Sequence, residues 1–223
     1  MSRGPATRIA FFDVDRTVIR GATVSYAIRY FVGKGEMSLR HLARGAFYAA
    51  LHHVNLLDYD SVFRQAVAPF VGMPEEEVIR ISRECFESLV KGKIYADAVE
   101  RIRGHVERGE PPVLISSGPR YIVYALRDHL RVPHAIASGP KVVAGRVTAE
   151  PDGDLCYKEG KLRRAREYSA ERGISLDDCY FYSDSISDLP LLSAVGCPRV
   201  VNPDPLLRRE ARRRGWEVLR FER

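Results

Sequence analysis

Short apolar runs that end in polar or acidic residues, with helical patterns between them, are the feature that most restricts how this chain folds. These runs span residues 8–12, 112–115 and 179–182. Such a run is typical of a buried strand, and strands that alternate with helices indicate βαβ units in a parallel sheet. Ligand sites of such sheets form beyond the carboxyl ends of the strands. The sequence therefore predicts an α/β fold, with a central parallel sheet flanked by helices.

The remaining elements follow from the periodicity of the apolar residues. Helices are expected at residues 120–130, 161–172 and 187–195, and a hairpin at residues 141–150. Residues 21–94 show helical spacing and no clear strand, which indicates a helical insertion between the first two strands. The predicted division is an α/β core domain of residues 1–20 and 95–223 and a helical cap domain of residues 21–94.

The composition is ordinary for a globular protein and excludes disordered and fibrous classes, with 45% hydrophobic and 29% charged residues. The net charge is +6, and basic residues cluster at positions 161–166 and 208–214. Because acids interrupt both clusters and no aromatic platform accompanies them, we expect solvated helix faces and no nucleic-acid partner. The most apolar stretch, residues 46–57, is too short for a membrane span.

The cysteines are scattered and form no C-x-x-C pattern, so neither a zinc site nor a disulfide framework is predicted. The first residues lack the apolar segment of a secretory signal. Together these features make the cytoplasm the expected location.

The first chemical motif is Asp13-Val14-Asp15-Arg16-Thr17, at the end of the opening strand. Residues two apart in an extended chain point to the same side, so Asp13 and Asp15 can address one ligand. Two carboxylates this close need a cation or a shared proton, and a hard cation such as Mg²⁺ prefers oxygen ligands. A capped turn, with Asp15 or Thr17 bonding backbone amides, is the alternative interpretation.

The second motif is Ser116-Ser117-Gly118, which follows the second strand and precedes a helix. A hydroxyl and adjacent amides at a helix N-terminus can hold phosphate oxygens. The alternative is an ordinary helix cap, with Ser117 as the capping residue.

Two further motifs add charge to the same edge. Lys161 lies at the front of a helix, where its ammonium group can screen the approach of two anions, although Lys158 is an alternative for this role. Asp184 and Asp188 follow the third strand one helical turn apart and can complete a cation site. Helix capping explains only one of these two acids.

The motif order DVDRT, LISSG, EGK and YSDSISD resembles the haloacid dehalogenase superfamily over nearly the whole chain. The resemblance is closest to its phosphoserine-phosphatase-like branch, subfamily IB. It implies a Rossmann-like core with an inserted α-helical cap of the C1 type, and a phosphatase that uses Mg²⁺. Ser183 and Ser117 depart from the pattern, since members often carry glycine at these positions.

The resemblance also implies a role for each matching residue. Asp13 is the nucleophile that forms an aspartyl phosphate, and Asp15 protonates the leaving alcohol and then activates water. Lys161 pairs with the nucleophile and the phosphate. The phosphate-binding residues are Thr17, Ser116, Ser117 and Gly118, and the metal-binding residues are Asp13, Asp15 through its main-chain carbonyl, Asp184 and Asp188.

Other functions remain open at this stage. A dehalogenase also uses an aspartate nucleophile but does not need Asp15 or the later acids. A phosphotransferase with the same intermediate, or a non-catalytic phosphate-binding or basic-surface module, is a further alternative. The expected partner is a small phosphomonoester such as phosphoserine, histidinol phosphate or a lipid-derived phosphate, while the oligomeric state is not predicted. The cap residues that would select it are Arg29, Tyr30, Arg40, His41, Arg44, Tyr48, His52 and His53.

Overall fold

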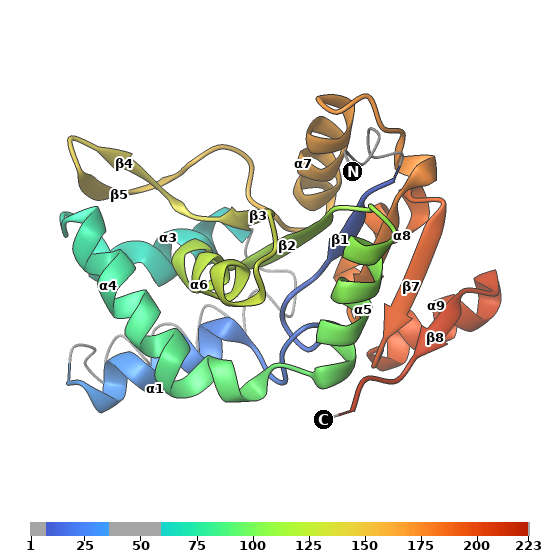
Figure 1. The fold of residues 1–223 in the computed structure, drawn as a ribbon. Helices are drawn as coiled ribbons and strands as arrows, with labels where there is room; N and C mark the ends of the chain where they lie inside the picture. The colour runs from blue at the N-terminus through green and yellow to red at the C-terminus, as the bar shows by residue number, and fades with distance from the viewer. Residues whose placement is uncertain (1–7, 36–58, 223) are drawn as a thin grey trace.

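A six-stranded parallel sheet forms the centre of the molecule (Figure 1). The structure is a computed structural model that describes residues 8–35 and 59–222. The strand order is β3-β2-β1-β6-β7-β8, and all neighbouring strands are parallel. The strands are β1 (Ala10–Phe12), β2 (Pro112–Pro119), β3 (His134–Ser138), β6 (Tyr180–Ser183), β7 (Cys197–Val201) and β8 (Glu217–Leu219). The predicted α/β fold with a central parallel sheet is confirmed.

Helices cover both faces of the sheet. Successive side chains of a strand point to opposite faces, so neighbouring residues of β1 pack against different helices. Phe12 belongs to one hydrophobic cluster and Phe11 to the other. The Phe12 cluster includes residues of α1 (Thr23–Gly33), α4 (Glu75–Cys85), α5 (Ala96–Glu107) and α6 (Arg120–Leu130). The Phe11 cluster includes residues of α7 (Glu159–Ala170), α8 (Leu189–Ala194) and α9 (Pro205–Arg214).

The described part of residues 21–94 is helical, as the sequence predicts. Besides α1 and α4 it contains α3 (Tyr59–Val67), a π-helical turn (Phe86–Val90) and two 3₁₀ turns (Ala68–Phe70 and Lys91–Lys93). None of these described segments joins the six-stranded sheet. Phe31 and Phe86 nevertheless share a hydrophobic cluster with Phe12 of β1. The helical layer is thus packed directly on the core, and the division into two domains stays a prediction.

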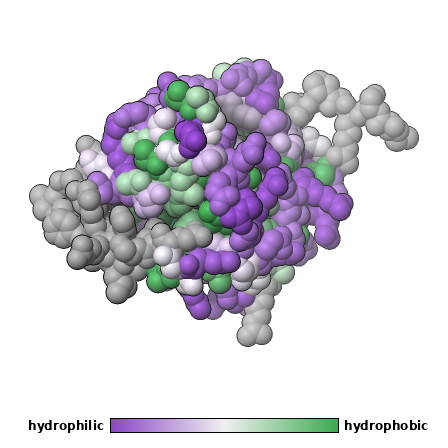
Figure 2. All heavy atoms as spheres, turned by 90° about the vertical axis from the view of Figure 1, so that its left-hand side faces the viewer, coloured by the Kyte–Doolittle hydropathy of each residue, from purple (hydrophilic) through white to green (hydrophobic). Residues whose placement is uncertain are grey.

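The predicted hairpin is present as β4 (Pro140–Val143) and β5 (Arg146–Pro151). Its turn residues, Ala144 and Gly145, both have positive φ, as a two-residue hairpin turn of type I′ requires. The hairpin packs against α3, where Phe63 and Val147 belong to one cluster and Arg64 forms an ion pair with Glu150. Figure 2 shows the face of the molecule on this side, with hydrophobic surface bordered by hydrophilic residues.

Several elements differ from the sequence prediction. The strands β3, β7 and β8 are not among the predicted elements, and the helix expected at residues 187–195 begins as a 3₁₀ turn (Ile186–Asp188) before α8.

Of the predicted cap residues, Arg29 is exposed, while Tyr30 is buried and donates a hydrogen bond to Glu84. The others lie outside the described residues: Arg40, His41, Arg44, Tyr48, His52 and His53.

All cysteines are free thiols, and Cys85, Cys156 and Cys179 are buried. Within the described ranges, the structure contains no helix with the length and apolar character needed to cross a membrane.

A buried polar network fixes α5 to the strand that leads to the candidate site. His105 Nδ1 lies 2.7 Å from Glu110 Oε2, and Nε2 lies 2.8 Å from the Tyr182 hydroxyl oxygen. The neutral tautomer with a proton on Nδ1 can donate to Glu110 and accept from Tyr182, and the Arg108 guanidinium, 2.9 Å from Nδ1, disfavours a positive charge on the ring. Burial lowers the pKa of His105, although Glu110 acts in the opposite direction. The folded protein therefore favours the neutral imidazole.

This network makes stability depend on pH. Because the pKa of His105 is lowered on folding, the unfolded chain binds a proton more readily below the ordinary value of 6.5. The contribution of His105 to stability is therefore complete above that value and falls as the pH drops below it toward the lowered pKa. We expect lowering the pH from 7.5 to 5.5 to reduce the urea midpoint of the wild type relative to that of His105→Gln. The exposed His129→Gln is the control. The same change of urea midpoint with pH in the wild type and in both variants would contradict the prediction.

Candidate active site

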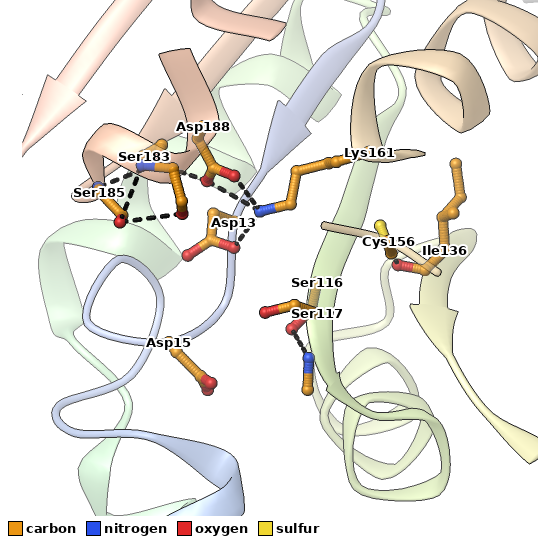
Figure 3. A network of polar contacts seen from close by, with 12 residues as sticks. Asp13, Asp15, Ser116, Ser117, Ile136, Cys156, Lys161, Ser183, Ser185 and Asp188 are labelled. Atoms are coloured by element: carbon orange, nitrogen blue, oxygen red, sulfur yellow. Dashed lines mark hydrogen bonds and ion pairs between the residues drawn. The ribbon is translucent and has the colours of Figure 1, made fainter. Parts of the chain in front are cut away.

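Asp13 lies at the carboxyl edge of the sheet, between residues that follow both neighbouring strands. The register pairs Phe12 with Leu114 of β2 and with Tyr182 of β6. The Asp13 backbone N–H donates to the Tyr182 carbonyl at 2.9 Å. The side chain of Asp13 is thereby placed in the buried group shown in Figure 3, where Lys161 reaches it from one side and Ser116 lies on another.

Lys161 joins two buried aspartates. Its Nζ lies 2.8 Å from Asp13 Oδ1 and 2.8 Å from Asp188 Oδ2. Burial opposes the charge on Lys161, but the two carboxylates outweigh it and raise the pKa of the ammonium group. Lys161 therefore stays protonated. The alternative lysine, Lys158, is exposed, and its Nζ lies 5.3 Å from the centroid of the Tyr157 ring.

The front of α7 is placed by a close backbone approach. A Cβ atom on Gly160 would lie 2.1 Å from the Leu155 carbonyl oxygen, so only glycine fits without movement. Lys158, the N-cap residue of α7, has φ +48°, a positive value that is rare for a residue with a side chain. This turn directs the next residue after Gly160, Lys161, into the sheet edge.

Asp188 and Asp184 are held by different partners. The Ser183 hydroxyl donates to Asp188 Oδ2 at 2.6 Å, so the serine that replaces the usual glycine has a contact of its own. The main-chain carbonyl of Asp184 accepts from the Asp204 N–H at 2.8 Å. Asp204 also accepts from the backbone N–H of Ile186 at 2.7 Å, which ties this loop to the start of α9.

Asp15 lies on a tight loop after β1 and is partly exposed. Its two carboxylate oxygens accept hydrogen bonds from Thr23, one from the backbone N–H at 2.8 Å and one from the hydroxyl at 3.1 Å. Desolvation raises the pKa of Asp15, and the two bonds from Thr23 act against this rise. Figure 3 shows Asp15 near Asp13 but outside the contacts of Lys161.

The hydroxyl groups of Ser116 and Thr17 have free hydrogen-bonding capacity. Ser116 Oγ accepts from the Gly118 N–H at 2.9 Å, which leaves its own proton for another acceptor. Thr17 Oγ1 is buried and has no hydrogen-bond partner among the described residues. A buried hydroxyl without a partner is costly unless a ligand or water satisfies it. These two hydroxyls suit an anionic oxygen ligand.

The alternative interpretation, in which Ser117 caps a helix, is wrong. Strand β2 continues to Pro119, and Pro119 is the N-cap residue of α6, without a side-chain capping bond. The residue before a proline favours extended backbone, so the strand extends through Gly118. Ser117 is therefore not the cap, and its carbonyl accepts from the Tyr59 hydroxyl at 3.0 Å.

The charges at this edge do not balance. Asp13, Asp184 and Asp188 are buried, whereas Lys161 is the single buried lysine or arginine in the described part of the chain. Burial raises the pKa of Asp13 well above its usual range and, with Asp188 next to it, raises the pKa of Asp184 to about 7. A divalent cation would favour the ionised forms.

The donor set therefore fits a hard cation, which prefers carboxylate and carbonyl oxygens. In the positions that the structure gives to the described side chains, no three acidic, histidine or cysteine residues converge closely enough to hold a metal ion together. The carboxylates would have to turn toward a common point.

The family is decided by comparison with known proteins. Residues 10–193 match the model of the haloacid dehalogenase-like hydrolase family. The chain belongs to this family. A probable phosphatase of Mycobacterium tuberculosis is 34% identical over 221 residues, which cover 98% of this chain and 77% of that protein. A histidinol-phosphatase of Neisseria meningitidis is 30% identical over 219 residues, or 96% of this chain and 99% of that protein.

A solved structure of similar shape supports the assignment. A crystal structure of a protein with unknown function from Bordetella pertussis has a TM-score of 0.88 and 27% identity, and the match covers 96% of this chain and 98% of that one. The resemblance of the four motifs to the haloacid dehalogenase superfamily is thus confirmed.

Three residues of this haloacid dehalogenase-like site were not singled out from the sequence as functional residues. Thr23 binds Asp15, Ser183 binds Asp188, and Asp204 braces the loop that carries Asp184. Asp204 has a sequence signal, because the aspartate in Asp204-Pro205 is typical of an N-cap before proline. Thr23 and Ser183 have no such signal, because each bonds to an aspartate five to eight residues away across a turn whose geometry the apolar periodicity does not specify.

The close contact at Gly160 predicts the effect of one added methyl group. We expect Gly160→Ala to lower the free energy of unfolding by ~1–3 kcal/mol, because overpacking outweighs the higher helix propensity of alanine. Gly33→Ala is the matched control, since a Cβ atom at this helical glycine meets nothing within 4 Å. Urea unfolding measures both. A Gly160→Ala protein as stable as the control variant would show that α7 has room there.

Proposed function

We propose that this hydrolase is a Mg²⁺-dependent phosphatase that cleaves a small phosphomonoester through an aspartyl phosphate on Asp13. The observation that carries the proposal is the buried contact of Lys161 with Asp13 and Asp188. It holds a carboxylate at the sheet edge beside hydroxyl groups that suit phosphate oxygens. A dehalogenase does not need the additional acidic residues at this edge, so their presence favours a phosphatase.

The contacts of Asp13 suit an attacking carboxylate. Lys161 binds Oδ1, which leaves the second oxygen to form the bond to phosphorus. As the ester P–O bond breaks, Asp15 gives its proton to the leaving oxygen. The raised pKa of Asp15 favours this protonated form, and general acids work best when their pKa lies near the working pH.

The second half-reaction releases inorganic phosphate. Asp15, now ionised, accepts a proton from the water whose oxygen attacks phosphorus, and the bond between Asp13 and phosphorus breaks. Lys161, Ser116 and Thr17 stabilise the charge on the phosphoryl oxygens in both steps. When bound by Asp13, Asp184 and the Asp15 carbonyl, with Asp188 beside them, Mg²⁺ would neutralise negative charge on these groups and on the phosphoryl oxygens.

The substrate class follows from the relatives and remains broad. A histidinol-phosphatase that matches 96% of the chain is among the relatives, and the motif resemblance includes phosphoserine phosphatases. We therefore propose a small phosphorylated metabolite, with histidinol phosphate and phosphoserine as the first compounds to assay. The cytoplasmic location stays a prediction from the cysteine pattern.

Metal dependence is the first test. We expect EDTA to abolish turnover of p-nitrophenyl phosphate and Mg²⁺ to restore it, because Asp13 and Asp184 need a counter-charge. Mg²⁺ is also expected to raise the melting temperature, since a ligand that binds only the folded state stabilises it. Both effects should weaken in Asp184→Asn and persist in Asp177→Asn, an exposed control. Full activity in metal-free buffer would contradict the proposed metal requirement.

The roles of Asp13 and Asp15 are separable. Asp13→Asn removes the attacking oxygen, so neither turnover nor a covalent intermediate should remain. Asp15→Asn should slow turnover by about 10²–10⁴-fold, the usual contribution of general acid–base catalysis. With the activated ester p-nitrophenyl phosphate, this variant should form the phosphoenzyme better than it hydrolyses it.

Rapid quenching and peptide mapping by mass spectrometry identify the modified residue. A phosphoryl group on Asp15 or Ser116, or normal turnover by Asp13→Asn, would contradict the mechanism.

A further inference from the structure

We propose that Thr23 is the residue that positions Asp15 for proton transfer, and that Gly118 is glycine because the Thr23 hydroxyl occupies the space of a side chain there. The inference rests on the proposed function, in which Asp15 is the general acid and base. Thr23 is the first residue of α1 and is 0% exposed.

Both oxygens of the Asp15 carboxylate are bound by this one residue. The Thr23 backbone N–H donates to Oδ1 at 2.8 Å and the hydroxyl donates to Oδ2 at 3.1 Å. A single bond would leave the carboxyl plane free to rotate, whereas two donors on the two oxygens fix it. The remaining lone pairs of Asp15 then keep one direction, which proton transfer to a bound ester oxygen requires.

The contact also has a structural consequence that has to be separated from positioning. The first N–H groups of a helix lack partners within the helix, and Ala22 at the N-cap offers no side-chain bond. Asp15 therefore caps α1 through the Thr23 N–H. The hydroxyl is not needed for this cap, so the two roles lie on different atoms of Thr23.

Gly118 gives an independent sign that the hydroxyl has a defined place. A Cβ atom on Gly118 would lie 2.3 Å from Thr23 Oγ1 and 3.1 Å from Ser116 Oγ. The Thr23 hydroxyl thus lies between Asp15 of the β1 loop and the segment of β2 that carries Ser116. This position links the proton-transfer residue to the hydroxyl proposed to hold phosphate.

Positioning makes a specific prediction about the leaving group. An alkyl phosphate needs a proton on its leaving oxygen, whereas p-nitrophenyl phosphate needs little. Thr23→Val keeps the shape and the backbone N–H but removes the hydroxyl donor. We expect it to lower kcat/KM for an alkyl phosphate such as β-glycerophosphate about 10-fold more than kcat/KM for p-nitrophenyl phosphate, because kcat also includes hydrolysis of the phosphoenzyme that both substrates share.

The matched variants separate positioning from folding. Thr23→Ser restores the donor and should return the ratio of the two rates to within about 3-fold of the wild type. Gly118→Ala displaces the hydroxyl and should change the ratio in the same direction as Thr23→Val. Ser25→Ala, an exposed change on the same helix, is the control. Melting temperatures report folding, and Thr23→Ala replaces Thr23→Val if valine prevents it.

The outcomes divide cleanly. An equal loss of kcat/KM on both substrates, or a loss in Thr23→Val that Thr23→Ser does not repair, assigns Thr23 a structural role only and overturns the inference while the proposed function stands. A wild-type protein that turns over no phosphomonoester refutes the proposed function, and the positioning role falls with it. A change in the ratio of the two rates with unchanged melting temperature supports the inference.

Discussion

The rest of this structure depends on the buried ionic contact of one lysine with two aspartates. Removing charges from water costs several kcal/mol per ion unless they are paired with good geometry. Lys161 comes from α7, Asp13 follows β1, and Asp188 ends the 3₁₀ turn after β6. The three charges are tolerable only when all three segments are in place. The pairing therefore couples the correct order of strands to the burial of each group.

The same edge of the sheet keeps an excess of negative charge. Asp184 is buried and its pKa is raised to about 7, because desolvation and Asp188 both disfavour its ionised form. A carboxyl group whose pKa is raised on folding lowers stability at neutral pH, and it is the kind of perturbed residue that marks functional sites. The family relationship and the excess of negative charge independently favour phosphoryl-transfer chemistry. That chemistry needs a cation at the site, beside the negatively charged phosphoryl group.

Much of the site was predictable because strand ends can be located from short apolar runs. Asp13 and Ser116 lie at the predicted edge, and Lys161 meets Asp13 as expected. The missed strands have local reasons: β7 contains Pro198, which strand propensity disfavours, and β8 has only three residues. Contacts such as that of Thr23 with Asp15 depend on the meeting of a loop and a helix, which no local pattern records.

The hairpin of β4 and β5 has a mechanical consequence. It lies in the sequence between β3 and α7, yet it contacts the helical layer, through the ion pair of Glu150 with Arg64 of α3 and through backbone hydrogen bonds of Val147 with Gly72 and Met73. The chain leaves the core to reach the helical layer and returns directly ahead of Lys161. Any displacement of α3 would carry the hairpin with it and pull on residues 152–158. Motion of the helical layer would thus be transmitted as tension to the backbone that holds the buried lysine.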